Sequence, residues 1–112
     1  MRLGIADDVG RLELSDPSHL NALSIEMASD MQSAVRWLAA QEKGSIRGAV
    51  LQGAGDHFCP GGNPYRMLAS SSTSLPAAAR SAIDLFDGFC RLRGLPMPVV
   101  GAAHGAVLGG GL

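Results

Sequence analysis

Residues 96–112 read Pro-Met-Pro-Val-Val-Gly-Ala-Ala-His-Gly-Ala-Val-Leu-Gly-Gly-Gly-Leu. The apolar run over 99–103, which follows Pro98, predicts a buried strand. Three consecutive glycines at 109–111 then predict a turn at which a helix begins. A strand that leads through glycines into a helix leaves backbone N–H groups free to bind an anion or a developing oxyanion. This stretch therefore indicates an α/β domain with an anion-binding turn.

A second strand followed by a glycine turn lies near the middle of the chain. Residues 49–51 (Ala-Val-Leu), between Gly48 and Gly53, predict another buried strand. The loop behind it contains Pro-Gly-Gly at 60–62, and the following Asn63-Pro64 predicts a helix start. If one N–H group from each glycine turn converged on one substrate oxygen, they would form an oxyanion hole, which is commonly the largest single contribution to catalysis.

The remaining periodicity places helices and strands around these two turns. Apolar and polar residues alternate over 3–5 and 9–14, which predicts a β-hairpin. Ser24 is the expected N-cap of a helix that runs to about Lys43 and buries Met27, Met31, Ala34, Val35 and Leu38. A second long helix is expected from Pro76 to near Arg93, with one apolar face made of Ala79, Ile83, Phe86 and Cys90. Between the turns and this helix, residues 70–74 form a polar low-complexity stretch.

Length and composition exclude several classes of protein. The 112 residues are enough for one domain, and 46% of them are hydrophobic and 17% charged. This composition excludes intrinsic disorder and a coiled coil. The net charge of −1 excludes a nucleic-acid partner. No apolar run is long enough for a membrane span, and the first residues carry no secretory signal. Cys59 and Cys90 are expected to be reduced core thiols, so we expect a cytoplasmic protein without a membrane partner.

Metal and nucleotide chemistry find little support in the sequence. His19, His57 and His104 have no second ligand at metal spacing, so no metal site is expected, and His104 is interpreted as a hydrogen-bonded structural histidine. Gly53 and Gly55 begin a dinucleotide-binding pattern that fails at Phe58. No P-loop or nucleophile elbow occurs, and no permanently bound cofactor is expected.

Three segments together resemble the enoyl-CoA hydratase/isomerase (crotonase) superfamily. Residues 58–63 (Phe-Cys-Pro-Gly-Gly-Asn), followed by Met67 and Leu68, are similar to its F-C/A-A/S-G-G/A-D segment. Residues 96–111 resemble its P-V-I-A-A-V-N-G-x-A-x-G-G-G segment, and residues 16–24 match its early P-x-x-x-N-A-L loop. The three motifs occur in family order and span the whole chain. The resemblance implies a fold of ββα units arranged as a spiral, here interrupted after the glycine triplet, with residues 1–112 as the N-terminal part of one domain.

The resemblance also implies a chemistry and a set of site residues. The enolate of an acyl thioester would be stabilised by the backbone N–H groups of Gly62 and Gly110. The loop of Asn21, Ala22 and Leu23 and the backbone of residues 60–62, with Pro60 and Gly61, would line the coenzyme A end of the substrate. Gly109 is a further expected substrate-binding residue. The residues expected to approach the acyl pocket are Tyr65, Met67 and Leu68. The substrate would carry coenzyme A or phosphopantetheine, and the family assembles as homotrimers or hexamers.

Departures from the family pattern leave the reaction open. The glutamate that hydratases place two residues after the glycine triplet would fall just past Leu112, so we expect these residues to be the front part of a longer domain. Asn63 stands in place of the usual Asp, and His104 in place of the usual Asn. Hydration of an enoyl-CoA is the leading expectation. The alternatives are a polyketide-pathway dehydratase or decarboxylase acting on carrier-protein-bound acyl groups, and a catalytically inactive fragment or interaction module. A half-spiral is expected to expose Val99, Val100, Ile83 and Phe86.

Overall fold

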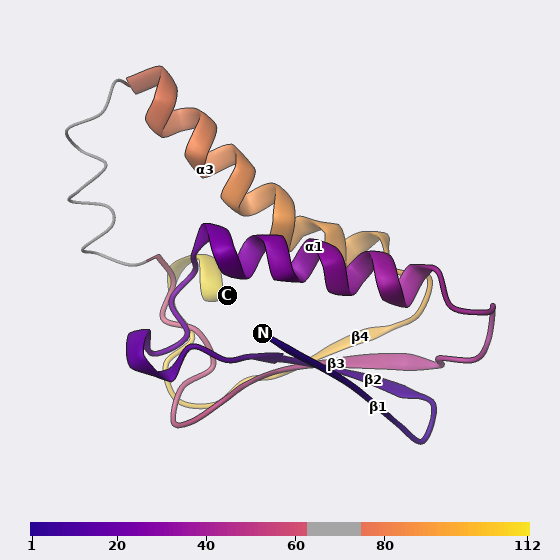
Figure 1. The fold of residues 1–112 in the computed structure, drawn as a ribbon. Helices are drawn as coiled ribbons and strands as arrows, with labels where there is room; N and C mark the ends of the chain where they lie inside the picture. Colours follow the sequence, from indigo (N-terminus) through magenta and orange to yellow (C-terminus); the bar gives the residue numbers. More distant parts are fainter. Residues whose placement is uncertain (63–74) are drawn as a thin grey trace.

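A four-stranded mixed sheet forms the base of the structure (Figure 1), a computed structural model that describes residues 1–62 and 75–112. Strands β1 (Arg2–Ala6) and β2 (Val9–Leu14) form the predicted antiparallel hairpin, with Ala6 opposite Val9. Strands β3 (Gly48–Gly53) and β4 (Val99–Ala102) add in parallel, giving the order β1-β2-β3-β4. Parallel neighbours bring the loops after β3 and β4 to the same edge of the sheet.

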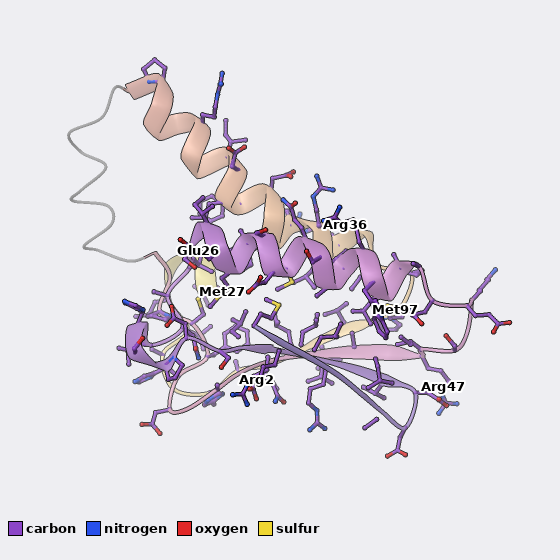
Figure 2. All side chains as sticks on the ribbon, viewed as in Figure 1. Arg2, Glu26, Met27, Arg36, Arg47 and Met97 are labelled. Carbon is purple, nitrogen blue, oxygen red and sulfur yellow. The ribbon has the colours of Figure 1, made fainter. Side chains whose placement is uncertain are left out.

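Helix α1 (Ile25–Ala39) covers one face of this sheet (Figure 1). Ser24 caps it as predicted, because its side chain accepts a hydrogen bond from the Met27 N–H at 3.1 Å. All five predicted core residues of the helix are buried. Figure 2 shows Met27 on the side of α1 that faces the sheet and Arg36 on the outer side. The helix ends four residues before the predicted Lys43, since Leu38 is its last buried residue.

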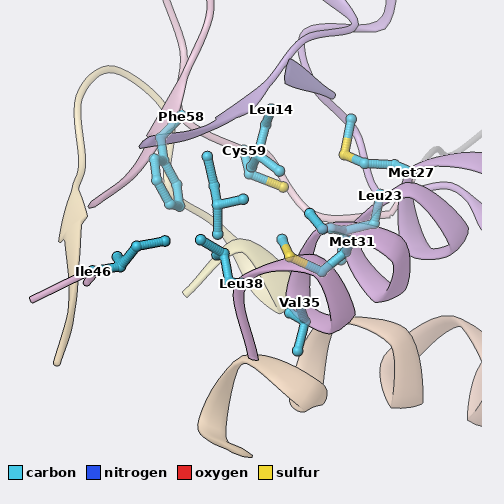
Figure 3. Packing of buried hydrophobic residues seen from close by; sticks show 11 residues of the cluster. Leu14, Leu23, Met27, Met31, Val35, Leu38, Ile46, Phe58 and Cys59 are labelled. Carbon is cyan, nitrogen blue, oxygen red and sulfur yellow. The ribbon is translucent and has the colours of Figure 1, made fainter. Parts of the chain in front are cut away.

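The core lies between α1 and the sheet, as seen in Figure 3. Leu12 and Leu14 alternate inward along β2, where they meet the apolar stripe of α1. Phe58 and Cys59 come from the loop after β3 and close one end of this cluster. The core therefore reaches directly to the loop that carries the first glycine turn.

Helix α3 (Leu75–Cys90) packs against α1 and continues into the short 3-10 helix η2 (Arg91–Gly94). Its contact with α1 is centred on Gly88, which is buried against Ala28. The predicted apolar face of α3 is exposed at Ile83, Phe86 and Cys90, because the approach to α1 selects the neighbouring face of the helix. The side chain of Ala79 lies outside the described side chains. The prediction of a core thiol holds for Cys59 and is wrong for Cys90.

The prediction that residues 99–103 form a buried strand is half right. Strand β4 forms, but Val99 and Val100 are exposed, Val100 to 61%. The physical reason is that β4 ends the described sheet and pairs only with β3. The exposure of these valines, and of Ile83 and Phe86, agrees with the expectation for a half-spiral. Among the helices that the structure describes, none has the length and apolar character needed to cross a membrane.

Candidate functional site

Two loops that leave the sheet at the same edge pair with each other. Three backbone hydrogen bonds join residues 58–59 of the loop after β3 to residues 104–108 of the loop after β4. Phe58 donates to the His104 carbonyl at 2.8 Å, and Cys59 donates to the Ala106 carbonyl at 3.1 Å. Leu108 then donates to the Cys59 carbonyl at 3.1 Å. The paired segments lead directly into the two glycine turns.

Beyond this pairing, the two glycine turns lie side by side. A Cβ placed on Gly61, whose φ is +97°, would lie 3.0 Å from the Leu108 carbonyl oxygen and 3.6 Å from the Gly110 nitrogen. The positive φ and the close approach both favour glycine at position 61. Gly109, Gly110 and Gly111 form the 3-10 turn η3 (Gly109–Gly111), at the place where a helix start was predicted. Two turns 48 positions apart in the sequence therefore meet in one place.

The predicted donor groups are free within the part of the chain that the structure describes. Neither the Gly62 N–H nor the Gly110 N–H donates to any described residue, and both glycines are exposed. The Gly61 carbonyl, by contrast, accepts from the Leu23 N–H at 2.7 Å. This bond joins the loop after β2 to the first glycine turn. Backbone N–H groups that are exposed and unpartnered are suited to bind an oxyanion.

Asn21 and Ala22 lie in the loop between β2 and α1, and both are buried. The Asn21 side chain is 1% exposed and uses both of its polar atoms inside the protein. Its Oδ1 accepts from the Asp16 N–H, and its Nδ2 donates to the carbonyls of Ala54 and His57, all at 2.8 Å. Asn21 therefore holds together the loops after β2 and β3, and its side-chain atoms are already occupied.

An apolar cavity of about 380 Å³ opens beside the second glycine turn. Gly110 and Gly111 form part of its wall, which also includes Leu23, Cys59, Phe86 and Phe89. Pockets that bind small ligands have volumes of roughly 300–1,000 Å³ and are mostly apolar with few polar groups. The cavity is therefore large enough and apolar enough for a short acyl chain.

Part of the predicted site lies outside the described residues. Tyr65, Met67 and Leu68, expected near the acyl pocket, and the helix start at 63–64 belong to this part, as does the polar stretch at 70–74. Pro60 lies in the described loop, half-buried, between Cys59 and the first glycine turn. The roles of all these residues stay predictions. Within residues 1–62 and 75–112, no three His, Cys, Asp or Glu side chains are grouped closely enough to hold a metal ion.

Two histidines that lie far apart in the sequence, His57 and His104, are found on the paired loops, and the ring of each bonds to the backbone of the opposite loop. His104 donates from Nε2 to the Gly55 carbonyl at 2.9 Å, which confirms it as a hydrogen-bonded residue. His57 accepts at Nδ1 from the Ala106 N–H at 2.9 Å. The sequence carried a usable signal, since each histidine follows one of two predicted strands by a few residues. The sequence did not establish that β3 and β4 pair in parallel, and this pairing brings together the loops that carry the two histidines.

The chain is similar to known proteins over its full length. The family model for enoyl-CoA hydratase/isomerase matches residues 4–112. The "Probable enoyl-CoA hydratase EchA14" of Mycobacterium tuberculosis (strain H37Rv) is 29% identical over 110 residues, which cover 98% of this chain and 41% of that protein. The peroxisomal Delta(3,5)-Delta(2,4)-dienoyl-CoA isomerase of Arabidopsis thaliana is 31% identical over 121 residues, covering 100% of this chain and 43% of that protein.

Solved structures agree with these relatives. The crystal structure of an enoyl-CoA hydratase from Polaromonas sp. JS666 superposes with a TM-score of 0.89 at 30% identity, covering 98% of this chain and 42% of that chain. Pseudomonas aeruginosa AtuE superposes with a TM-score of 0.86 at 28% identity, over 98% and 42% of the two chains. The chain thus spans about two-fifths of the length of the relatives that it matches. From its match to the family model and its fold, the chain belongs to the enoyl-CoA hydratase/isomerase family.

Proposed function

We propose that this chain forms the thioester-binding part of an enzyme that acts on an acyl-CoA through an enolate. The observation that carries the proposal is the meeting of the two glycine turns. It brings to one edge of the sheet the N–H groups of two exposed glycines, Gly62 and Gly110, which have no partner among the described residues. Addition of water to the β-carbon of an enoyl thioester, or removal of a proton from the carbon next to the carbonyl in an isomerisation, moves negative charge onto the carbonyl oxygen. Two N–H donors fixed in advance would stabilise that charge.

The neighbouring residues receive corresponding roles. The acyl chain would enter the apolar cavity beside Gly110, with Tyr65, Met67 and Leu68 approaching it. The coenzyme A end would lie along Pro60, Gly61 and Gly109 and along the backbone of Asn21 and Ala22, because the Asn21 side chain is already hydrogen-bonded. Hydration and isomerisation share the enolate-like step, and named relatives of both kinds match this chain. Hydration of an enoyl-CoA is our leading assignment.

Binding of acetoacetyl-CoA tests the proposal, because its enolised thioester carries the negative oxygen that the two donors would bind. Free coenzyme A is the reference ligand, and the ratio of the two affinities isolates the contribution of the acyl thioester. Gly110→Pro deletes one N–H. Gly110→Ala is the matched control because it keeps the N–H. Its Cβ would meet two side-chain ends, Leu23 Cδ1 at 2.7 Å and the edge of the Phe86 ring at 3.1 Å, and both side chains would have to shift slightly.

We expect Gly110→Pro to lower the thioester preference roughly 10- to 100-fold, the worth of one hydrogen bond to a charged group. Gly110→Ala should stay within a few-fold of the wild-type ratio. In a complete domain that also supplies the acid/base carboxylates, Gly110→Pro should lower turnover of crotonyl-CoA by a factor on the order of 10²–10³. The assignment is wrong if the folded proline and alanine variants have the same ratio as the wild-type chain.

A further inference from the structure

The side chain of His57 takes part in the pairing of the loops after β3 and β4. The Nδ1 atom of His57 accepts from the Ala106 N–H at 2.9 Å. The carbonyl of the same residue accepts from Asn21 Nδ2 at 2.8 Å. The ring therefore supplies the acceptor for Ala106 while the backbone carbonyl anchors the loop before α1. One residue joins three loops.

The loop after β4 approaches the His57 ring closely at Gly105. A Cβ on Gly105, whose φ is +59°, would lie 2.8 Å from His57 Nδ1 and against the Asp56 carbonyl oxygen. Glycine thus lets the loop after β4 cross directly over residues 56 and 57. His57 itself is half-buried, and its ring makes the hydrogen bond to the Ala106 N–H.

The contact lies immediately before the second glycine turn. After Ala106, one further hydrogen bond, from Leu108 to the Cys59 carbonyl, precedes Gly109. A shift of the 104–108 segment relative to 57–59 would therefore carry Gly110 away from Gly61 and Gly62. Displacing a positioned group by about 1 Å can cost on the order of 10² in rate. The His57 ring is thus placed to set the spacing of the two turns without touching a substrate.

We propose that His57 is a positioning residue that sets the Gly110 N–H opposite the Gly62 N–H by accepting the Ala106 N–H. This inference rests on the proposed thioester site. An Nδ1 acceptor requires that the ring carry no proton on this nitrogen. An asparagine at position 57 would place Oδ1 where Nδ1 lies and keep the acceptor. A leucine would fill the same space with a methyl group that cannot accept.

The test compares the wild-type chain with His57→Asn and His57→Leu in three measurements. Thermal unfolding reports whether each variant is folded. Hydrogen exchange followed by mass spectrometry reports protection of peptides that cover 104–108 and 109–112. Equilibrium dialysis gives the affinities for acetoacetyl-CoA and for coenzyme A. A purely structural role would change the unfolding temperature of both variants but leave the ratio of the two affinities unchanged.

We expect His57→Leu to lower that ratio roughly 10- to 100-fold and to speed exchange at 109–112, whereas His57→Asn should resemble the wild-type chain. A folded leucine variant with the wild-type ratio would overturn the proposal, as would an asparagine variant that loses as much as the leucine variant. If His57→Leu does not fold, His57→Gln takes its place in the test. The glutamine carbonyl oxygen lies one bond further out than Nδ1, so this variant should also lower the ratio of the two affinities.

A wild-type chain that binds acetoacetyl-CoA no more tightly than coenzyme A would count against the proposed function. In that case hydrogen exchange alone would test the role of His57. Faster exchange at 109–112 in His57→Leu than in His57→Asn would support positioning of the second turn. Equal exchange in the two variants would refute it.

Discussion

At the scale of single residues, the two cysteines have opposite surroundings. Burial raises the pKa of the Cys59 thiol, and a hydrogen bond from the Gly61 backbone offsets only part of that effect. Cys90 is exposed at the end of α3. Since the thiolate is the reactive form, position and protonation both protect Cys59.

We therefore expect iodoacetamide at pH 8 to modify Cys90 well before Cys59, as measured by peptide mass spectrometry over time. Equal alkylation rates for the two thiols would contradict this prediction.

The raised pKa of Cys59 also predicts the direction of a pH effect on stability. The folded chain favours the neutral thiol of Cys59. The contribution of this thiol to the free energy of unfolding is therefore complete below the pKa of an unfolded cysteine, and it is lost as pH rises through the higher pKa of the folded chain. Urea unfolding above pH 9 should show this loss in the wild-type chain but not in Cys59→Ala. A loss of the same size in Cys59→Ala would contradict this prediction.

Asn21 combines a left-handed backbone, with φ of +62°, and three buried hydrogen bonds. Asn21→Ala should cost about 2–4 kcal/mol of unfolding free energy, because it strands one N–H and two carbonyls and forces alanine into a strained conformation. Asn21→Gly loses the same bonds but tolerates the backbone, so it should be about 1 kcal/mol more stable than the alanine variant. Chemical denaturation measures both. A loss below 0.5 kcal/mol in both variants would show that the loop does not depend on this side chain.

At the scale of elements, the close contact between α1 and α3 depends on a glycine, Gly88, which has no side chain to separate the two helices. A Cβ on Gly88 would lie 2.8 Å from both the Cβ and the carbonyl oxygen of Ala28. Neither atom belongs to a flexible chain end, so the two helices would have to separate. Tight helix packing at a glycine is therefore what fixes the face of α3 that turns inward.

Gly88→Ala should destabilise the chain by about 1–3 kcal/mol through overpacking, despite the better helix propensity of alanine. Gly94→Ala is the matched control, because a Cβ there meets nothing within 4 Å. It should be neutral or slightly stabilising. Thermal or urea unfolding of the two variants provides the measurement. A Gly88→Ala variant as stable as Gly94→Ala would show that the helices do not pack as described.

The elements differ in how far the sequence could predict them. The hairpin, the Ser24 cap and the core stripe of α1 follow from local periodicity and capping, and all three are confirmed. The inward face of α3 could not be predicted in the same way. Periodicity identifies Ile83 and Phe86 as part of one apolar face but does not say which face packs on α1. The close approach of Gly88 to Ala28 decides that, and these two residues lie 60 positions apart in the chain. The meeting of His57 with Ala106 likewise depends on the order of β3 and β4.

At the scale of the whole molecule, apolar side chains remain on the described surface. Val100 on β4 and Ile83 on α3 are 61% and 66% exposed, and Phe86 and Val99 are exposed as well. Strand β4 lies at the edge of the described sheet and offers unpaired backbone groups there. Exposed apolar surface next to an open strand edge favours association.

We expect the 112-residue chain to self-associate, with sedimentation velocity showing species larger than 11.5 kDa. Ile83→Glu combined with Val100→Lys should shift the distribution toward monomer without loss of helix signal in circular dichroism. A monodisperse wild-type monomer at micromolar concentration would contradict this prediction. The homotrimer or hexamer that the resemblance implies stays a prediction that the same experiment addresses.

The central claim is that N–H groups from two distant glycine turns act on one thioester oxygen. Infrared difference spectroscopy of acetoacetyl-CoA labelled with carbon-13 at the thioester carbonyl tests it most directly, because hydrogen bonds to that oxygen lower its stretching frequency. The account predicts a lower frequency for the ligand bound to the wild-type chain and to Gly110→Ala, and a smaller lowering for Gly110→Pro. A carbonyl that binds the wild-type chain at its free-solution frequency would contradict the account.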